Sequence, residues 1–169
     1  MRETRSSGST DRLIRLFSTS RGNAARSNFA VWGYDDDGET TQLFVNAIDP
    51  YEGIRPLGMQ EEGTTRLQVE AKGGWLIEVR PIDSARVAPV GDIVKGAGDD
   101  VLRVEGEADT AIIEGNAAQS NFAVWAYGGF FPDLLLNEIE QYSGETMVPP
   151  GTEYLVVEAK GPWAISLRE

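Results

Sequence analysis

Short runs of alternating apolar and polar residues follow one another along the chain. One run covers 67–71; after the glycine pair 73–74, Trp75, Ile77 and Val79 continue the alternation on one face. A period of two with one apolar face is typical of a half-buried β-strand, and two such runs joined by a glycine turn predict a hairpin. We therefore expect Trp75 to face a protein core.

The same alternation returns near the C-terminus. Leu155 and Val157 precede the turn 161–162, and Trp163 and Ile165 follow it on one face. No window of about 11 residues shows an amphipathic helical stripe. Short strands separated by glycine, aspartate, asparagine and proline favour a β-sandwich.

Another strand segment is apolar on both faces. In residues 29–34, Trp32 and Tyr34 project to the side opposite Phe29 and Val31. A strand that is apolar on both sides predicts a central position with both faces covered. The alternative is that Trp32 and Tyr34 form an exposed patch that binds a partner, and the matching pair Trp125 and Tyr127 poses the same question.

Three segments of the first half recur in the second half in the same order. The first pair differs only at Arg26/Gln119 and Gly33/Ala126. The pairs are 22–34 with 115–127, 43–53 with 134–144, and 67–77 with 155–165. Differences in length fall between these segments, where surface loops tolerate them. We interpret the pattern as an internal duplication.

These patterns predict an all-β protein made of two tandem antiparallel β-sandwich modules, jelly-roll-like and related by duplication. We expect about five to seven strands in each module, with a single ten-strand sandwich as the alternative. The predicted organisation is a disordered tail at 1–10, a first repeat at 11–80, a linker at 81–97 and a second repeat at 98–169. The linker is inferred from the Pro- and Gly-containing stretch between the repeats.

The repeated residues resemble the pre-peptidase C-terminal type of β-sandwich and its relatives in secreted actinobacterial and haloarchaeal proteins. In the second half the resemblance is carried by Gly98-Asp99-Asp100-Val101, Ser120 to Trp125, Leu135-Leu136-Asn137, Tyr142, Gly144, Leu155 to Ala159 and Gly161-Pro162-Trp163; in the first half it runs from Ser27 to Ile77. It implies a non-catalytic, jelly-roll-like accessory domain.

Charge and composition narrow the classes of function. The formal net charge of −12 disfavours nucleic acid and anionic membrane surfaces as partners, since both require clustered Lys and Arg. The sequence contains no His and no Cys, which removes the usual general base, thiolate nucleophile and commonest metal ligands. We therefore expect a protein that is not an enzyme and needs no cofactor.

Two loops carry candidate binding residues. Asp35, Asp36 and Asp37 offer oxygen ligands that Ca²⁺ prefers, although an EF-hand spacing is missing, and a solvated hairpin loop is the alternative. Phe130 and Phe131 are adjacent on a glycine-led loop, where both cannot easily be buried. They dock into a partner or fold back over the end of the sandwich.

Recurring asparagines and aromatic residues have two interpretations. We expect Asn28, Asn46, Asn121 and Asn137 to be buried and to fix turns; the alternative is a set of amides that contact a sugar, with the tryptophans as stacking platforms. The sequence shows no signal peptide and no apolar run of roughly 18 residues that would span a membrane.

Two hypotheses for function follow. The first is a structural or interaction protein whose sandwich-end loops dock on a protein assembly or a second copy, for example as a virion capsid or tail decoration protein. The second is a carbohydrate- or cell-envelope-binding module of a surface or secreted protein. Location therefore stays open between virion and cell surface.

Overall fold

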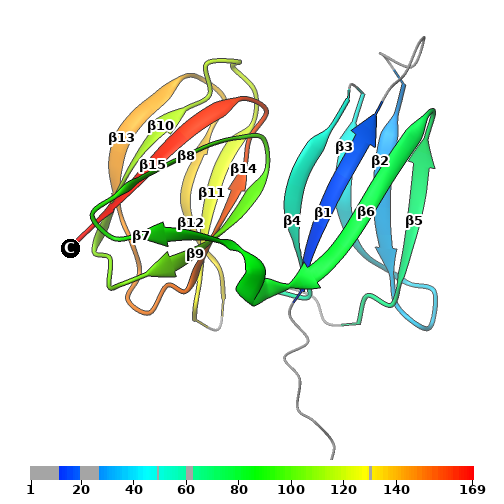
Figure 1. Ribbon diagram of the computed structural model, residues 1–169, viewed down its shortest axis with the longest axis horizontal. Coiled ribbons are helices and arrows are strands. Elements are labelled where there is room, and N and C mark those ends of the chain that lie inside the picture. Colours follow the sequence, from blue (N-terminus) through cyan, green and yellow to red (C-terminus); the bar gives the residue numbers. More distant parts are fainter. Residues whose placement is uncertain (1–11, 20–26, 49, 60–62, 130) are drawn as a thin grey trace, which may run out of the picture.

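The computed structural model describes residues 12–19, 27–48, 50–59, 63–129 and 131–169, with only the backbone described for 12–19. The protein is all-β, as predicted: no α-helix occurs in the described residues. Its strands fall into two units, each made of two sheets, which lie side by side in Figure 1.

The first unit contains six strands in two three-stranded sheets, ordered β4-β1-β6 and β3-β2-β5. All described pairings in these sheets are antiparallel. The strands are β1 (Arg12–Thr19), β2 (Phe29–Tyr34), β3 (Thr40–Ala47), β4 (Glu52–Leu57), β5 (Arg66–Ala71) and β6 (Gly74–Pro81). Phe29, Val31, Phe44 and Val45 are buried between the sheets, with Ile77 packed against them.

The second unit contains nine strands, more than predicted. Its sheets are ordered β13-β10-β15-β8 and β12-β11-β14-β9-β7. The strands are β7 (Arg86–Pro89), β8 (Ile93–Ala97), β9 (Asp100–Glu105), β10 (Thr110–Gly115), β11 (Phe122–Tyr127), β12 (Asp133–Glu138), β13 (Tyr142–Met147), β14 (Tyr154–Glu158) and β15 (Pro162–Arg168). The core between its sheets includes Phe122, Val124, Leu155, Trp163 and Ile165.

Six strands of the two units correspond in order and pairing. β1 lies between β4 and β6, as β10 lies between β13 and β15. In the other sheets, β2 lies between β3 and β5, as β11 lies between β12 and β14. The two aromatic strands β2 and β11 are therefore central, which agrees with their apolar faces. The recurring segments thus occupy equivalent strands, and their origin by duplication stays a prediction.

The expected linker at 81–97 is wrong. A short 3₁₀ turn, η1 (Ile82–Ser84), is followed by β7, which pairs in parallel with β9, and β8, which pairs with β15. Both strands lie at sheet edges. A proline such as Pro89 of β7 is tolerated there, because one side of an edge strand has no neighbour that needs its missing N–H. Pro and Gly in this stretch mark edge strands and turns rather than a free connector.

The expectation for Trp75 is also wrong, whereas that for Trp163 is confirmed. The exposed fraction is 52% for Trp75 and 3% for Trp163. Val79 is exposed as well, whereas Ile165 and Leu167 are buried. The difference arises because β15 has β8 on its outer edge, whereas no described strand pairs with the outer edge of β6.

The recurring asparagines are exposed rather than buried. Asn28, Asn46, Asn121 and Asn137 all lie at the surface. Among the described residues the buried asparagine is Asn116, whose side chain accepts from the backbone N–H of Ser120 and donates to the backbone oxygens of Ser120, Glu138 and Glu140. Asn116 has a positive φ of 62°, which asparagine tolerates better than most residues.

Candidate functional site

A network of partly buried polar side chains lies where the two units meet. The turn between β8 and β9 places Gly98 and Asp99 against β4 of the first unit. The backbone N–H of Ile54 donates to the backbone oxygen of Asp99 over 2.9 Å. One turn of the second unit is therefore bonded directly to a strand of the first.

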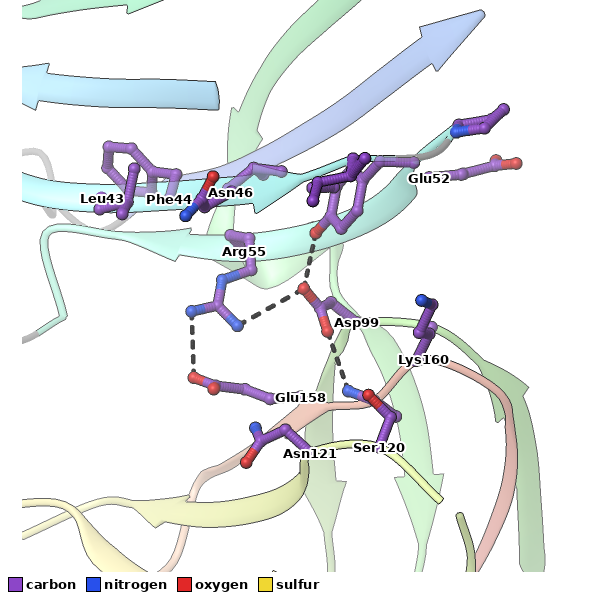
Figure 2. A pocket seen from close by; sticks show the side chains of 17 residues that line it. Leu43, Phe44, Asn46, Glu52, Arg55, Asp99, Ser120, Asn121, Glu158 and Lys160 are labelled. Atoms are coloured by element: carbon purple, nitrogen blue, oxygen red, sulfur yellow. Dashed lines mark hydrogen bonds and ion pairs between the residues drawn. The ribbon is translucent and has the colours of Figure 1, made fainter. Parts of the chain in front are cut away.

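The Asp99 carboxylate has donors from both units (Figure 2). Its Oδ2 accepts from the Tyr51 hydroxyl at 2.6 Å, and its Oδ1 accepts from the backbone N–H of Ala159 at 2.9 Å. Tyr51 belongs to the first unit and Ala159 follows β14 of the second. Burial raises the pKa of Asp99, and the neighbouring charge of Arg55 partly offsets that rise.

Arg55 of β4 joins two carboxylates of the second unit (Figure 2). Its Nη2 lies 3.0 Å from Glu158 Oε1, and its Nη1 lies 3.6 Å from Asp99 Oδ2. Only 12% of the Arg55 side chain is exposed. Burial by itself would lower the pKa of Arg55, but the charges of Glu158 and Asp99 raise it, so the guanidinium stays charged. We call Tyr51, Arg55, Asp99 and Glu158 the junction network.

A glycine two residues after each recurring tyrosine explains that part of the repeat. A Cβ at Gly53 would come within 2.4 Å of the Tyr51 hydroxyl oxygen, and a Cβ at Gly144 would come within 2.4 Å of that of Tyr142. Each tyrosine ring therefore folds back over its glycine. In the first unit this places the Tyr51 hydroxyl within reach of Asp99.

Gly98 ties the junction network to the core of the second unit. Its backbone oxygen accepts a hydrogen bond from Trp163 Nε1 at 2.9 Å, and its N–H donates to the backbone oxygen of Gly161. Its φ is +74°, a conformation that glycine adopts without strain. The tryptophan of β15 thus holds the turn that carries Asp99.

An apolar cluster covers the same contact on another side. Val101, Val156, Tyr127, Ile82 and Ala85 are buried, and the partly buried side chains packed on them include Ile54 and Met59 of the first unit as well as Trp125 and Tyr154. These side chains face away from the interior of the second sandwich. Each unit thus has its own core, and a third apolar cluster lies between the units.

A pocket of about 680 Å³ lies beside the junction network (Figure 2). β3 and β4 contribute one wall, and the ends of β8, β11 and β14 contribute the other. Side chains with amide or charged groups on its lining are Asn46, Glu52, Arg55, Asp99, Asn121, Glu158 and Lys160. Such a mixed lining suits a ligand that both donates and accepts hydrogen bonds.

The junction network is better suited to holding two units together than to moving protons. Arg55 is bound between two carboxylates, and both oxygens of Asp99 accept hydrogen bonds. Opposite charges and hydrogen bonds between neighbouring groups stabilise a contact. One donor of the network is not engaged: among the described residues, Arg55 Nε is a buried polar atom without a hydrogen-bond partner.

Alkaline pH tests the Tyr51–Asp99 contact. Burial raises the pKa of Tyr51 well above its ordinary value, and the charge of Asp99 adds to the rise. Above the unfolded pKa of about 10, the unfolded chain loses this proton while the folded chain keeps it. Stability from Tyr51 is therefore complete below pH 10 and declines as the pH rises toward the folded pKa.

Above the unfolded pKa, the loss of one proton on unfolding lowers the free energy of unfolding by about 1.4 kcal/mol per pH unit. We expect this decline to be absent in the Tyr51→Phe variant. Urea unfolding at several pH values between 8 and about 11 measures it. Below pH 9 the difference between the wild-type and variant free energies of unfolding should be constant. Parallel curves up to pH 11 would contradict the buried contact.

The four aromatic residues predicted as a partner-binding face lie close to the contact between the units or inside one unit. Tyr127 is buried, and Trp125 is partly buried beside it in the cluster between the units. Both line a small pocket of about 160 Å³ with Arg55. Trp32 and Tyr34 are partly buried on β2. The structure therefore does not present these rings as one open patch.

The two loop candidates have different surroundings. Phe131 is 83% exposed, whereas Phe130 lies outside the described residues. Asp35 Oδ1 accepts from the backbone N–H of Glu39, which closes the turn, and Asp36 and Asp37 are exposed. In the part of the chain that the structure describes, no group of three or more carboxylates is placed to hold a metal ion.

Sequence reasoning missed Arg55 and Glu158 as members of one site. The available signal was a difference between the repeats: counted from the recurring Tyr and Gly, Arg55 stands where the second half has Thr146. A charged residue that is present in only one of the two repeats indicates a contact that only that repeat makes. Nothing in the local pattern links Arg55 to a carboxylate about 100 residues away.

Comparisons with other proteins add no family. Neither a scan against protein-family models nor a search of the curated proteins gives a match for this chain. No helix in the described residues is long and apolar enough to cross a bilayer. The resemblance to pre-peptidase C-terminal sandwiches stays a prediction.

Proposed function

We propose that this chain is a non-catalytic interaction protein, whose two sandwich units are held as one body that docks on a protein assembly. The observation that carries the proposal is the junction network, in which Tyr51 and Arg55 of one unit bind Asp99 and Glu158 of the other. Binding two units at a fixed angle gives a partner a surface larger than either unit offers.

Exposed apolar side chains supply surface for such docking. Phe131 is 83% exposed on the loop after β11, and Trp75 and Leu76 are about half exposed on β6. When a partner covers large exposed apolar side chains, apolar surface is removed from water, which favours binding. A capsid or tail of a virion is one assembly that would use an acidic decoration protein of this kind.

The pocket beside the junction network favours a second candidate, a carbohydrate- or cell-envelope-binding module. Its lining presents the exposed amides of Asn46 and Asn121 together with charged groups. Amides and carboxylates that converge on one cavity are suited to hydroxyl-rich ligands.

Two measurements on the full chain separate the candidates. In gradient sedimentation of an extract from the source cells, docking predicts that the chain travels with a particle far larger than its own 18.4 kDa. A glycan array, run with and without calcium, should be silent. Sedimentation as a free chain together with a glycan signal that Asn121→Ala abolishes would replace the first candidate by the second.

A further inference from the structure

The outer edge of β6 differs from the equivalent edge of β15. β15 has antiparallel neighbours on both sides, β10 and β8, and its Trp163 lies opposite Gly96. β6 pairs with β1 on one side, where Trp75 lies opposite Ser18, and no described strand pairs on the other. In Figure 1, β1 lies beside β6 in its sheet and β4 lies beyond β1.

The second unit shows what the missing neighbour would do. Trp163 is 3% exposed because its ring lies over Gly96, where an added Cβ would come within 2.2 Å of the ring. Trp75 is 52% exposed, and Leu76 and Val79 on the same strand are 54% and 47% exposed. A tryptophan with a glycine opposite it can lie flat across the neighbouring strand, and this buries the ring and the glycine.

The β6 edge has few of the features that protect an edge strand, and these lie in its second half. The ion pair of Glu78 and Arg80 and the terminal Pro81 are there, and its pairing with β1 shows no bulge. Its first half exposes the large apolar side chains of Trp75 and Leu76. An exposed apolar edge of this kind pairs readily with a further strand.

We propose that the outer edge of β6 is a docking site for an extended strand of a partner protein, which pairs antiparallel to β6 and places a glycine opposite Trp75. The proposal rests on the proposed function and specifies how the docking occurs. Backbone hydrogen bonds provide affinity in such strand addition, and the fit of alternate side chains provides specificity. β8, with the sequence Ile93-Val94-Lys95-Gly96-Ala97, is the template for the partner strand.

In the second unit the covering strand precedes β10. Gly96 stands 19 residues before Gly115, the β10 residue opposite Trp163. The β1 residue opposite Trp75 is Ser18. If residues that precede β1 cover the edge of β6, the full chain will not bind an added peptide, so the binding test below also decides between a partner strand and that occupant.

Sequence and charge favour a partner over a second copy. The only glycine of β6 is Gly74, at its first position, so an antiparallel pairing of β6 with itself that put Gly74 opposite Trp75 would leave most of both strands unpaired. Two copies would each carry a net charge of −12. A strand with a basic residue, like Lys95 of β8, is the better match for this chain.

Peptide binding to the full chain tests the proposal. The probe is a fluorescein-labelled peptide with the sequence of residues 91–98, Gly-Asp-Ile-Val-Lys-Gly-Ala-Gly. We expect saturable binding by fluorescence anisotropy, weakened at least about 10-fold by Gly96→Val in the peptide or by Trp75→Ala in the chain. The matched control is Phe131→Ala, which removes another exposed aromatic side chain and should leave binding unchanged.

Disulfide trapping tests the register, because the chain has no cysteine of its own. Lys95 lies opposite Ala164, whose equivalent on β6 is Leu76. Leu76→Cys in the chain should therefore form a disulfide with a peptide carrying Lys95→Cys faster than with one carrying Val94→Cys. Equal rates would overturn the assigned register.

Three results would overturn the docking site. They are no binding at about 1 mM peptide, binding that Trp75→Ala leaves unchanged, or a dimer of the chain that Trp75→Ala dissociates, which would assign the edge to a second copy. If the peptide fails while the chain still sediments with a large particle, this inference alone is wrong. If the peptide binds and no particle is found, the proposed function is wrong.

Discussion

Replacing Trp163 by alanine is expected to lower the free energy of unfolding of the second unit by about 3–5 kcal/mol, the usual loss when a buried tryptophan is truncated. Its side chain fills the core between the two sheets and is 3% exposed. The variant also removes the hydrogen bond from Nε1 to the backbone oxygen of Gly98. The variant should therefore also destabilise the turn that carries Asp99.

The matched control is Trp75→Ala, at the equivalent position of the first unit. Since Trp75 is 52% exposed and no described strand covers it, its truncation should cost less than about 1 kcal/mol. Equilibrium urea unfolding followed by far-UV circular dichroism measures both variants without relying on tryptophan emission. Similar losses for the two variants would contradict the difference in burial between these positions.

The all-β fold was predictable because alternation is a local property. Leu67 and Val69 alternate with the polar residues Gln68 and Glu70 on a period that only an extended chain can bury on one side. The two-sided apolar pattern of 29–34 likewise predicted a central strand, and β2 lies between β3 and β5. Local pattern therefore determined which segments are strands and which of these are central.

Burial of a given strand was less predictable, because it depends on which neighbour lies beside the strand. Trp75 and Trp163 occupy the same position in equivalent sequences, yet only Trp163 is covered. The covering strand β8 comes from residues whose Gly and Pro neighbours suggested a linker. A periodicity of two identifies an apolar face without showing what packs on it.

The junction network was outside the reach of sequence reasoning for a related reason. Tyr51 and Asp99 are 48 residues apart and lie in different units, so their contact exists only after both units have folded and met. Asp99 and Ala159 are 60 residues apart within the second unit, so their contact exists only after that unit has folded. Gly98 and Asp99 form the turn between β8 and β9. The partners of that turn depend on tertiary placement, which no short spacing encodes.

Removing the cation of the junction network is the second large effect that we expect. Arg55→Met keeps much of the side-chain volume but leaves the carboxylates of Asp99 and Glu158 close together without a positive charge. Breaking one partner of a buried ion pair typically costs about 3–5 kcal/mol, because the remaining charge is uncompensated. Because the partners lie in different units, part of this loss should appear as separate unfolding of the two units.

Arg80→Met is the matched control, since Arg80 pairs with Glu78 on the surface of β6 and 51% of its side chain is exposed. An exposed ion pair contributes about 0–1 kcal/mol, so this variant should unfold almost as the wild type does in urea. Equal losses for Arg55→Met and Arg80→Met would show that the junction network does not hold the units together.

A double variant separates the cost of stranded charge from the loss of side-chain packing. Asp99→Asn removes one of the two carboxylates and keeps an oxygen that accepts from Tyr51. If uncompensated charge dominates, Arg55→Met combined with Asp99→Asn should be more stable than Arg55→Met alone, with a coupling energy of about 1–3 kcal/mol in the urea measurements. Strictly additive losses would indicate that Arg55 contributes through its packing against the second unit, and the fixed angle between the units would then depend on the apolar cluster around Val156 and Tyr127.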